Sequence, residues 1–323
     1  MKKVLIILLA SMLVSSLLAG CGGAQKATEQ KAADKKFINI ATGGTAGVYY
    51  PLGGAIAEIL NKNVPGINAT AQSTGASVAN INMLKEGKVE LAMVQNDIAY
   101  YAFKGTEMFQ DKQAANIRGL ATLYNETIQI IVMEESSIKT IEDLKGKKVA
   151  VGSIGSGTEA NARQILETYG ITYNDLKPQY LSFGEAANGL KDGNVDVAFV
   201  TAGAPTAAIQ DIAFQKKVRL IPIEADKADA LIKKYPFYAK QLVPANTYPG
   251  QTTALATVAV KAMLVVPDNL DMDTVYKMTK AIYANTDRLK AAHKLGEGIT
   301  KESALEGMPI PVHPGADKFF KEK

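Results

Sequence analysis

Four short segments of the chain have residue types that could bind a small solute. They are rich in glycine, serine and threonine, and their sequences are TGGTAG (42–47), STG (73–75), GSIGSGT (152–158) and TAG (201–203). Glycine lets a ligand approach the backbone closely, hydroxyls donate and accept hydrogen bonds, and a helix that starts at such a segment offers free N–H groups to an anion. A serine or threonine before a helix is more often only its N-cap. Four segments of the same character nevertheless favour one shared site.

The third segment also resembles a dinucleotide-binding fingerprint. Residues 155–160 (GSGTEA) fit the pattern G-x-G-x-x-A, which requires an acidic residue about 20 positions further on, at the end of the next strand. Asp175 has nearly this spacing but precedes the expected strand 179–181, which is followed by Ser182. The fingerprint is therefore incomplete, and an NAD-linked oxidoreductase remains as an alternative. A phosphate-binding P-loop is excluded, because Thr158 stands where that motif requires lysine.

No catalytic residue is assigned. The sequence has neither a G-x-S-x-G nor an H-E-x-x-H motif, and its two histidines, His293 and His313, are far in sequence from the four segments. We interpret His313 as a structural cap before a helix at 317–320. Cys21 is the only cysteine, so disulfides and thiolate zinc sites are excluded, and two histidines are too few for a multi-histidine metal site. We therefore expect no enzyme, no metal and no cofactor.

The elements that must position the four segments alternate between short apolar runs and helical patterns. The first series is 37–41 before 48–62, 69–72 before 78–85, and 89–94 before 98–103, and the second is 147–151 before 158–169, 179–181 before 185–191, and 195–200 before 205–214. This alternation predicts an α/β fold, and the two similar series predict two lobes. The segments would then lie at the carboxyl ends of parallel strands, where open α/β sheets bind ligands.

Two further β-branched runs, 128–133 and 251–266, are expected to be extended connectors between the lobes. A helical pattern at 274–284 then returns the chain to the first lobe. The predicted lobe 1 is therefore residues 37–127 plus 255–323, and the predicted lobe 2 is residues 128–254.

Residues 1–20 have the pattern of a signal peptide. Lys2 and Lys3 precede an uncharged apolar run that is short for a spanning helix, which needs about 20 apolar residues. The sequence LAGC at 18–21 resembles the bacterial lipobox, so we expect Cys21 to be lipidated and residues 21–36 to form a polar tether. The predicted location is extracytoplasmic, anchored to the cell membrane as a lipoprotein. A secreted protein with a free thiol is the alternative.

Composition and charge limit the possible partners. The chain has 323 residues, of which 47% are hydrophobic and 21% are charged, as in an ordinary globular protein. A formal net charge of +4 does not indicate a nucleic-acid-binding surface. We expect a monomer that binds a small-molecule solute and no nucleic acid.

Six separated blocks of the sequence resemble a known family. They are GTAGVYYPLG (44–53), STGAS (73–77), DLKGK (143–147), GSGTE (155–159), YPFY (235–238) and HPGA (313–316). In this order they are similar to the TAXI family of TRAP transporter solute receptors, and the resemblance covers Phe37 to the end of the chain. The chain has Ile154 and Asn125 where family members often have proline.

The resemblance implies a two-lobe clamp of the periplasmic-binding-protein type (type II) with two connecting strands. Such a receptor closes on a small carboxylate or amino acid, with glutamate or glutamine as the best precedent, and delivers it to a sodium-coupled membrane permease without chemistry. A surface lipoprotein that acts as a sensor or adhesin, without a permease, would share the leader, the fold and the pocket. This alternative also stays open.

The resemblance and the loop positions together predict the residues of the pocket. Matching positions in the family motifs are Thr45, Gly47, Tyr49, Ser73, Thr74, Ser156, Gly157 and Thr158, and loop position adds Asn96 and Gly203. The four segments contain no lysine or arginine, so a solute carboxylate is expected to be held mainly by backbone and hydroxyl donors. Arg118 and Arg163 are the arginines that we consider able to reach in from nearby.

Overall fold

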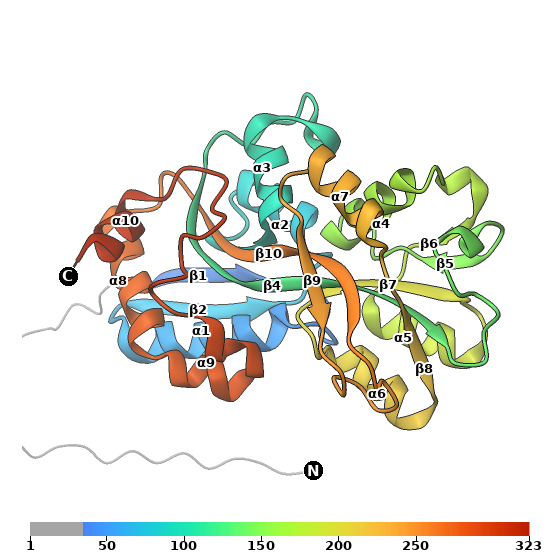
Figure 1. Ribbon diagram of the computed structural model, residues 1–323. Coiled ribbons are helices and arrows are strands. Elements are labelled where there is room, and N and C mark those ends of the chain that lie inside the picture. The colour runs from blue at the N-terminus through green and yellow to red at the C-terminus, as the bar shows by residue number, and fades with distance from the viewer. Residues whose placement is uncertain (1–34, 323) are drawn as a thin grey trace, which may run out of the picture. The chain divides into compact units, whose positions relative to one another are not determined.

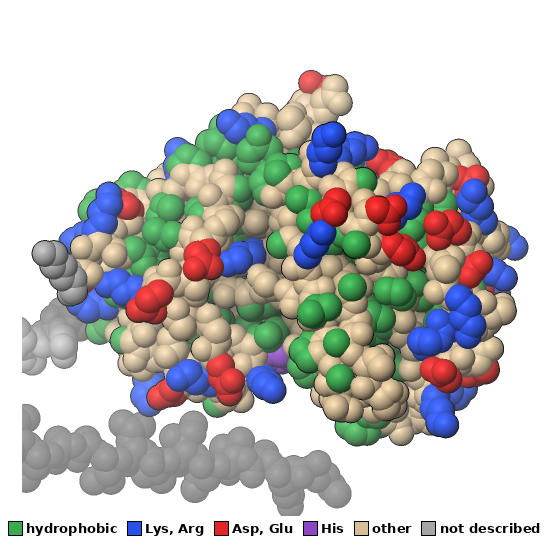
Figure 2. Space-filling view, viewed as in Figure 1, with side chains coloured by type: hydrophobic (Ala, Val, Ile, Leu, Met, Phe, Trp, Pro, Cys, Tyr) green, Lys and Arg blue, Asp and Glu red, His purple; other side chains and the backbone are tan. Residues whose placement is uncertain are grey.

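The computed structural model describes residues 35–322 (Figure 1). The predicted signal peptide, Cys21 and all of the tether except Lys35 and Lys36 lie outside the described residues. Within the described part of the chain, no helix is both long enough and apolar enough to cross a membrane. Acidic and basic side chains are interspersed on the face that Figure 2 shows, so no single sign of charge dominates it.

Strands and helices alternate along most of the described chain, as predicted. The strands are β1 (Lys36–Ala41), β2 (Ile67–Gln72), β3 (Leu91–Gln95), β4 (Ile117–Met133), β5 (Lys148–Ala150), β6 (Lys177–Gln179), β7 (Val197–Ala202), β8 (Val218–Ile221), β9 (Ala239–Val243) and β10 (Leu255–Pro267). The helices are α1 (Tyr49–Asn63), α2 (Ser77–Lys85), α3 (Asn96–Lys104), α4 (Gly157–Thr168), α5 (Phe183–Asp192), α6 (Ala207–Gln215), α7 (Ala225–Lys234), α8 (Met272–Ala284), α9 (Thr286–Ala292) and α10 (Pro314–Lys321). The α/β prediction is confirmed.

The predicted connector at 128–133 is only the last part of a strand of 17 residues, β4. The preceding part, residues 117–127, contains Arg118, Gly119, Asn125 and Glu126, which interrupt the apolar pattern that predicts a strand. Pairing with β10 keeps this part extended, since the register runs from Pro267 opposite Ile117 to Ala259 opposite Thr127. The sequence patterns also do not predict β8, α7 and β9, of which β9 is mostly exposed and α7 is strongly charged.

The ten strands of the described residues form one mixed sheet. Its order is β2-β1-β3-β10-β4-β7-β5-β6, with β8 paired to β4 and β9 paired to β10. Strands β1, β2 and β3 are parallel to one another, as are β5, β6 and β7. The long strands β4 and β10 are antiparallel to each other and lie between these two sets. We use the names lobe 1 and lobe 2 for the residue ranges predicted above.

The core lies on both faces of this sheet. In β3, Leu91 and Met93 belong to one cluster of buried hydrophobic side chains, whereas Ala92 and Val94 belong to another. Alternate side chains of a strand point to opposite faces, so each cluster covers one face. Helices α1, α5 and α6 contribute to the first cluster and α2, α3 and α4 to the second, in agreement with their places in Figure 1. The sheet edge at the carboxyl ends of the parallel strands stays free for the glycine-rich loops.

Candidate functional site

A cavity of about 50 Å³ lies where loops of lobe 1 and lobe 2 meet. Its lining residues are Gly43, Gly44, Gly47, Val48, Tyr49, Thr74, Gly75, Ala76, Ser77, Gln95, Tyr124, Glu126, Ser153, Ser156, Gly157, Thr158, Ser182, Phe183, Thr201 and Ala202. The first residues of α1, α2, α4 and α5 are all in this set. The cavity therefore lies beside the positive ends of four helix dipoles, two from each lobe.

The structure brings six of the ten predicted site residues to the cavity wall. They are Gly47, Tyr49, Thr74, Ser156, Gly157 and Thr158. The loops that carry them follow β1, β2 and β5, so the shared carboxyl edge expected from the sequence does gather them. Their contact with a solute stays a prediction.

Four predicted site residues do not line the cavity. Thr45 and Ser73 are exposed, and the Ser73 hydroxyl donates a hydrogen bond to the Gly43 carbonyl at 2.9 Å. The Asn96 side chain is occupied elsewhere, because its Oδ1 accepts from the Lys261 N–H at 3.0 Å and its Nδ2 donates to the Gly307 carbonyl at 3.3 Å.

Gly203 has a packing role instead. A Cβ built on this residue would lie 1.8 Å from a methyl carbon of Leu295, so the chain there has no space for a side chain. Its carbonyl accepts a hydrogen bond from the Thr206 hydroxyl at 2.8 Å. Loop position alone is therefore a poor guide, since it does not say which way a loop residue faces.

Helix capping accounts for part of the hydroxyl pattern. Ser156 Oγ accepts from the Glu159 N–H at 3.1 Å and caps α4. Ser182 caps α5 in the same way, and the Glu185 carboxylate accepts a hydrogen bond from the Ser182 N–H. The interpretation of His313 as a cap is confirmed, because its Nδ1 accepts from the Gly315 N–H at the start of α10. Ser156 both caps α4 and lines the cavity.

The sequence analysis missed the polar side chains that come from the strands. Gln95 ends β3 and Glu126 lies within β4, and both are buried in the cavity wall. Gln95 directly follows the predicted strand 89–94, so its place at a carboxyl edge was a usable signal. Glu126 had no such signal, because it precedes the segment 128–133 that the pattern predicts to be extended.

Burial changes the protonation of Glu126 in the cavity wall. Only 2% of Glu126 is exposed, and Gln95 Nε2 donates to its Oε2 at 3.2 Å. Burial raises the pKa of Glu126 to about 8, while the Tyr49 hydroxyl and the Gln95 amide beside the carboxyl group oppose the rise. Burial and the nearby Glu126 raise the pKa of both Tyr49 and Tyr124 well above the ordinary value, so both phenols stay neutral.

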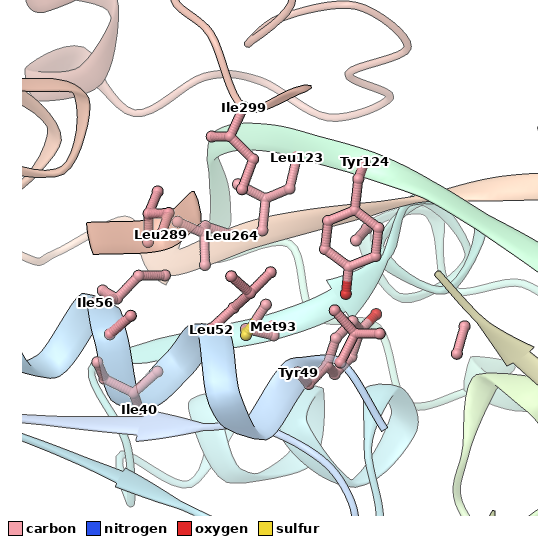
Figure 3. Close-up of a cluster of buried hydrophobic side chains, with 14 of the residues drawn as sticks. Ile40, Tyr49, Leu52, Ile56, Met93, Leu123, Tyr124, Leu264, Leu289 and Ile299 are labelled. Atoms are coloured by element: carbon pink, nitrogen blue, oxygen red, sulfur yellow. The ribbon is translucent and has the colours of Figure 1, made fainter. Parts of the chain in front are cut away.

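Several buried polar atoms of the cavity wall have no hydrogen-bond partner among residues 35–322. They are the hydroxyls of Tyr49, Tyr124 and Thr201, Oε1 of Gln95 and Oε1 of Glu126. Figure 3 shows the rings of Tyr49 and Tyr124 with their hydroxyl oxygens near one another. An unpaired buried polar group costs roughly 1–3 kcal/mol, so such atoms are rare unless another molecule completes them. Their concentration at one cavity indicates a place for a polar ligand.

The two lobes touch around the cavity. The Gly155 carbonyl accepts from the Val78 N–H at 3.0 Å and from the Ala79 N–H at 3.1 Å. Gln95 Oε1 lies so close to Gly157 that a Cβ on this glycine would be 1.8 Å away from it. These contacts join segments that are distant in sequence, so residues of lobe 1 and lobe 2 meet around the cavity.

The dinucleotide alternative finds little support in this geometry. Asp175 lies in a 3-10 turn before β6, and its Oδ2 accepts from the Thr172 N–H and hydroxyl, both at 2.8 Å. It therefore caps a turn and does not end a strand beside the loop 152–158. Among residues 35–322, no group of three or more His, Cys, Asp or Glu side chains could hold a metal ion.

Comparison with known proteins identifies a matching family and one relative that is similar over a short segment. A family model described as the NMT1-like family matches residues 40–323. A candidate aliphatic sulfonates-binding protein of Escherichia coli (strain K12) is 40% identical over 67 residues, which are 21% of this chain and 21% of that protein. The match thus spans about a fifth of the relative's length.

Two solved structures share the fold at low sequence identity. A candidate L-cystine ABC transporter protein from Listeria monocytogenes is 18% identical, with 83% of this chain and 99% of that chain covered and a TM-score of 0.52. PhnD1 from Prochlorococcus marinus (MIT 9301), in complex with methylphosphonate, is 11% identical, with coverage of 80% and 88% and a TM-score of 0.53. The chain therefore has a periplasmic-binding-protein-like α/β fold and, by the match over residues 40–323, belongs to the NMT1-like family.

Proposed function

We propose that this protein is an extracytoplasmic solute receptor of a TRAP-type transporter of the TAXI class. It captures a small carboxylate or amino acid of the glutamate or glutamine kind and delivers it to a membrane permease without chemical change. The observation that carries the proposal is the cluster of unpartnered buried polar atoms at the closing interface of the two lobes. A solute that completes these hydrogen bonds stabilises the closed arrangement over an open one.

The carboxylate assignment rests on the donors around the cavity. Helices α2 and α4 start at lining residues on opposite sides of the lobe interface, and hydroxyls of Thr74 and Thr158 lie beside them. None of the described lining residues is Lys, Arg or His. A phosphate or polycarboxylate receptor would be expected to use such cations, whereas helix starts and hydroxyls suffice for a single carboxylate.

The two arginines considered as possible contributors are engaged elsewhere. Arg118 pairs with Asp268 at 3.2 Å and donates to the carbonyls of Ala115 and Ile117. Arg163 lies 3.9 Å from Glu107 and 3.7 Å from Glu159. Neither lines the cavity.

The ligand class is tested with the purified full-length protein. Native mass spectrometry detects a retained solute directly, and a thermal-shift screen should find glutamate, glutamine and related acids among the stabilising compounds. A ligand at about a hundredfold excess over its Kd stabilises by about 2.7 kcal/mol, which is visible as a raised melting temperature. If only sugars, cations or nucleotides shift the transition, the carboxylate assignment is wrong. A melting temperature raised by NAD would instead support the oxidoreductase alternative.

The type of permease needs a separate test. The six sequence blocks support a TRAP permease, whereas the Listeria structure is described as an ABC transporter protein. Uptake into vesicles that contain the neighbouring permease gene's product separates the two, because a sodium gradient drives the first type and ATP the second. Absence of a permease gene nearby would favour the sensor or adhesin role.

Membrane attachment through Cys21 is part of the proposal. Each buried methylene of an acyl chain contributes about 0.8 kcal/mol, so two chains hold a folded domain at a bilayer. The variant Cys21→Ala should leave the membrane fraction or remain unprocessed. A variant that fractionates like the mature wild type would show that the lipobox interpretation is wrong.

A further inference from the structure

Glu126 is the only acidic side chain among the described residues that line the cavity. It lies on β4 opposite Val260 of β10, in the part of the sheet shared by the two lobes. Its Oε2 accepts from Gln95 Nε2, but its Oε1 is buried without a partner. Burying a carboxyl group with an open acceptor is unfavourable, so a site that retains one beside a cavity indicates a donor supplied from the cavity.

In its ionised form, Glu126 needs a partner that donates hydrogen bonds. Gln95 Nε2 donates to Glu126, and Gln95 Oε1 is therefore a second buried acceptor without a donor. The other unpartnered atoms, on Tyr49, Tyr124 and Thr201, are hydroxyls that can adapt to either role. A primary ammonium group offers three N–H donors and a positive charge, and the described lining residues provide no other cation for Glu126.

The opposite requirement holds at the helix starts, where N–H groups and positive potential favour an anion. We propose that Glu126 binds the protonated amino group of the solute while the helix starts bind its carboxylate. Glu126 is then the residue that selects amino acids over carboxylic acids without an amine. This inference rests on the proposed function, because it assumes that a carboxylate solute occupies this cavity.

The pH dependence of affinity distinguishes this arrangement from one in which protonated Glu126 donates to the solute. Before a solute binds, Glu126 is largely protonated at pH 7, with a pKa of about 8, and the charged or titratable groups around it are Tyr49, Tyr124 and Asp97. An ammonium group needs the carboxylate, so binding releases a proton and affinity rises between pH 6 and pH 8. If protonated Glu126 instead donated to a second carboxylate of the solute, affinity would be constant below pH 8 and fall above it.

The experiment uses pairs of probes that differ only in the amine: L-glutamate with glutarate, L-glutamine with glutaramate, and L-leucine with 4-methylpentanoate. Isothermal titration of the wild type should find at least one amino acid bound about 100-fold or more tightly than its partner. In Glu126→Gln, which keeps the size but removes the charge, that preference should fall below about tenfold. The control Glu58→Gln, at an exposed carboxylate that pairs with Arg288, should keep the wild-type preference.

Three outcomes overturn the role of Glu126: carboxylic acids that bind the wild type without preference for the amine, a preference that survives in Glu126→Gln, or wild-type affinity that does not rise from pH 6 to pH 8. The pH series uses only the wild type, so it decides the matter even if the variant folds poorly. If no carboxylic acid of either kind binds, the proposed function fails, and this inference fails with it. That result differs from the other three because no binding is seen at all.

Discussion

Helix α4 takes part in two buried polar regions that join the lobes, and the two regions differ in how well they are completed. Its first turn, with Gly157 and Thr158, lines the cavity, where wall atoms lack partners. Its next turns carry Asn161 and Gln164, which are fully buried and bonded to side chains of other elements. We call the second region the α4 network.

The α4 network consists of Asp97, Tyr101, Asn161, Gln164 and Tyr238. Asn161 Nδ2 donates to Asp97 Oδ2 at 3.0 Å and to the Tyr238 hydroxyl at 2.8 Å. Tyr238 in turn donates to Gln164 Oε1 at 2.7 Å, and Gln164 Nε2 donates to the Tyr101 hydroxyl at 3.2 Å. These residues come from both lobes. Asp97 Oδ1 and Asn161 Oδ1 have no partner among the described residues, but the four bonds between these side chains join the lobes without a solute.

The comparison separates what the protein provides from what a solute must provide. Side chains of the α4 network bond mainly to one another, so their removal should affect folding more than binding. Cavity side chains have open positions, so their removal should affect binding more than folding. The predictions below test this difference.

The largest expected effect comes from Gly157→Ala. A Cβ at this position would lie 1.8 Å from Oε1 of Gln95, which is itself held against Glu126. The lobes could then not reach the closed arrangement, and affinity for the solute should fall by about 100-fold or more, or about 2.7 kcal/mol. Calorimetric titration measures the loss.

The matched control is Gly54→Ala in α1, where a Cβ would meet nothing within 4 Å. Alanine is favoured over glycine in a helix by about 1 kcal/mol, so this variant should melt slightly higher and bind normally. Equal affinities of the two variants would show that closure does not depend on the contact at Gly157.

In the α4 network, Tyr238→Phe removes a hydroxyl that both accepts and donates. The free energy of unfolding should fall by about 1–3 kcal/mol, because Asn161 and Gln164 lose a buried partner, while affinity should change less than about tenfold. Denaturant unfolding and titration check the two quantities. Tyr276→Phe, whose hydroxyl accepts only from exposed Lys280, should leave both unchanged. A binding defect larger than the folding defect would reverse the assignment of the two regions.

Ser156→Ala acts on both properties, since Ser156 caps α4 and lines the cavity. Affinity should fall by roughly tenfold, or about 1.4 kcal/mol, and the lost cap should cost about 1 kcal/mol of stability. Asp271→Ala removes the cap of α8, away from the cavity, and should show only the stability loss. If the two variants bind equally well, Ser156 is a cap and nothing more.

The two regions also differ in how stability depends on pH. Burial raises the pKa of Asp97 to about 7, so the folded state binds a proton that the unfolded state has released above about pH 4. Stability should therefore fall as pH rises from about 4 to 7, by at most about 1.4 kcal/mol per pH unit for this group, and level off above its folded pKa. Denaturant unfolding at several pH values measures the slope.

Asp97→Asn should make this slope shallower, with or without solute. Glu126→Gln should also make the slope shallower, up to about pH 8. The difference between this variant and the wild type should change when an amino acid is bound, because the bound amino acid occupies the Glu126 carboxylate of the wild type. Equal responses of the two variants to solute would remove the distinction between the two regions.

The segments that follow strand ends could be predicted with good accuracy from the sequence. The runs before Thr42, Gly152 and Thr201 have the apolar pattern of buried strands, and glycine or hydroxyl residues mark where each strand ends. These are local signals, so six of the ten predicted residues reach the cavity. Asn96 and Gly203 do not line the cavity, because the direction a loop residue faces depends on the partners packed against it.

The sequence by itself determined the strand and helix alternation, the glycine and hydroxyl loops, and the caps at Ser156 and His313, because each depends on neighbours within a few residues. Only the tertiary structure decided that β4 extends back to Ile117 and that Glu126 and Gln95 meet in the cavity wall. A buried carboxyl group in a strand is unfavourable on local grounds. Pairing between β4 and β10, which are far apart in sequence, holds it there.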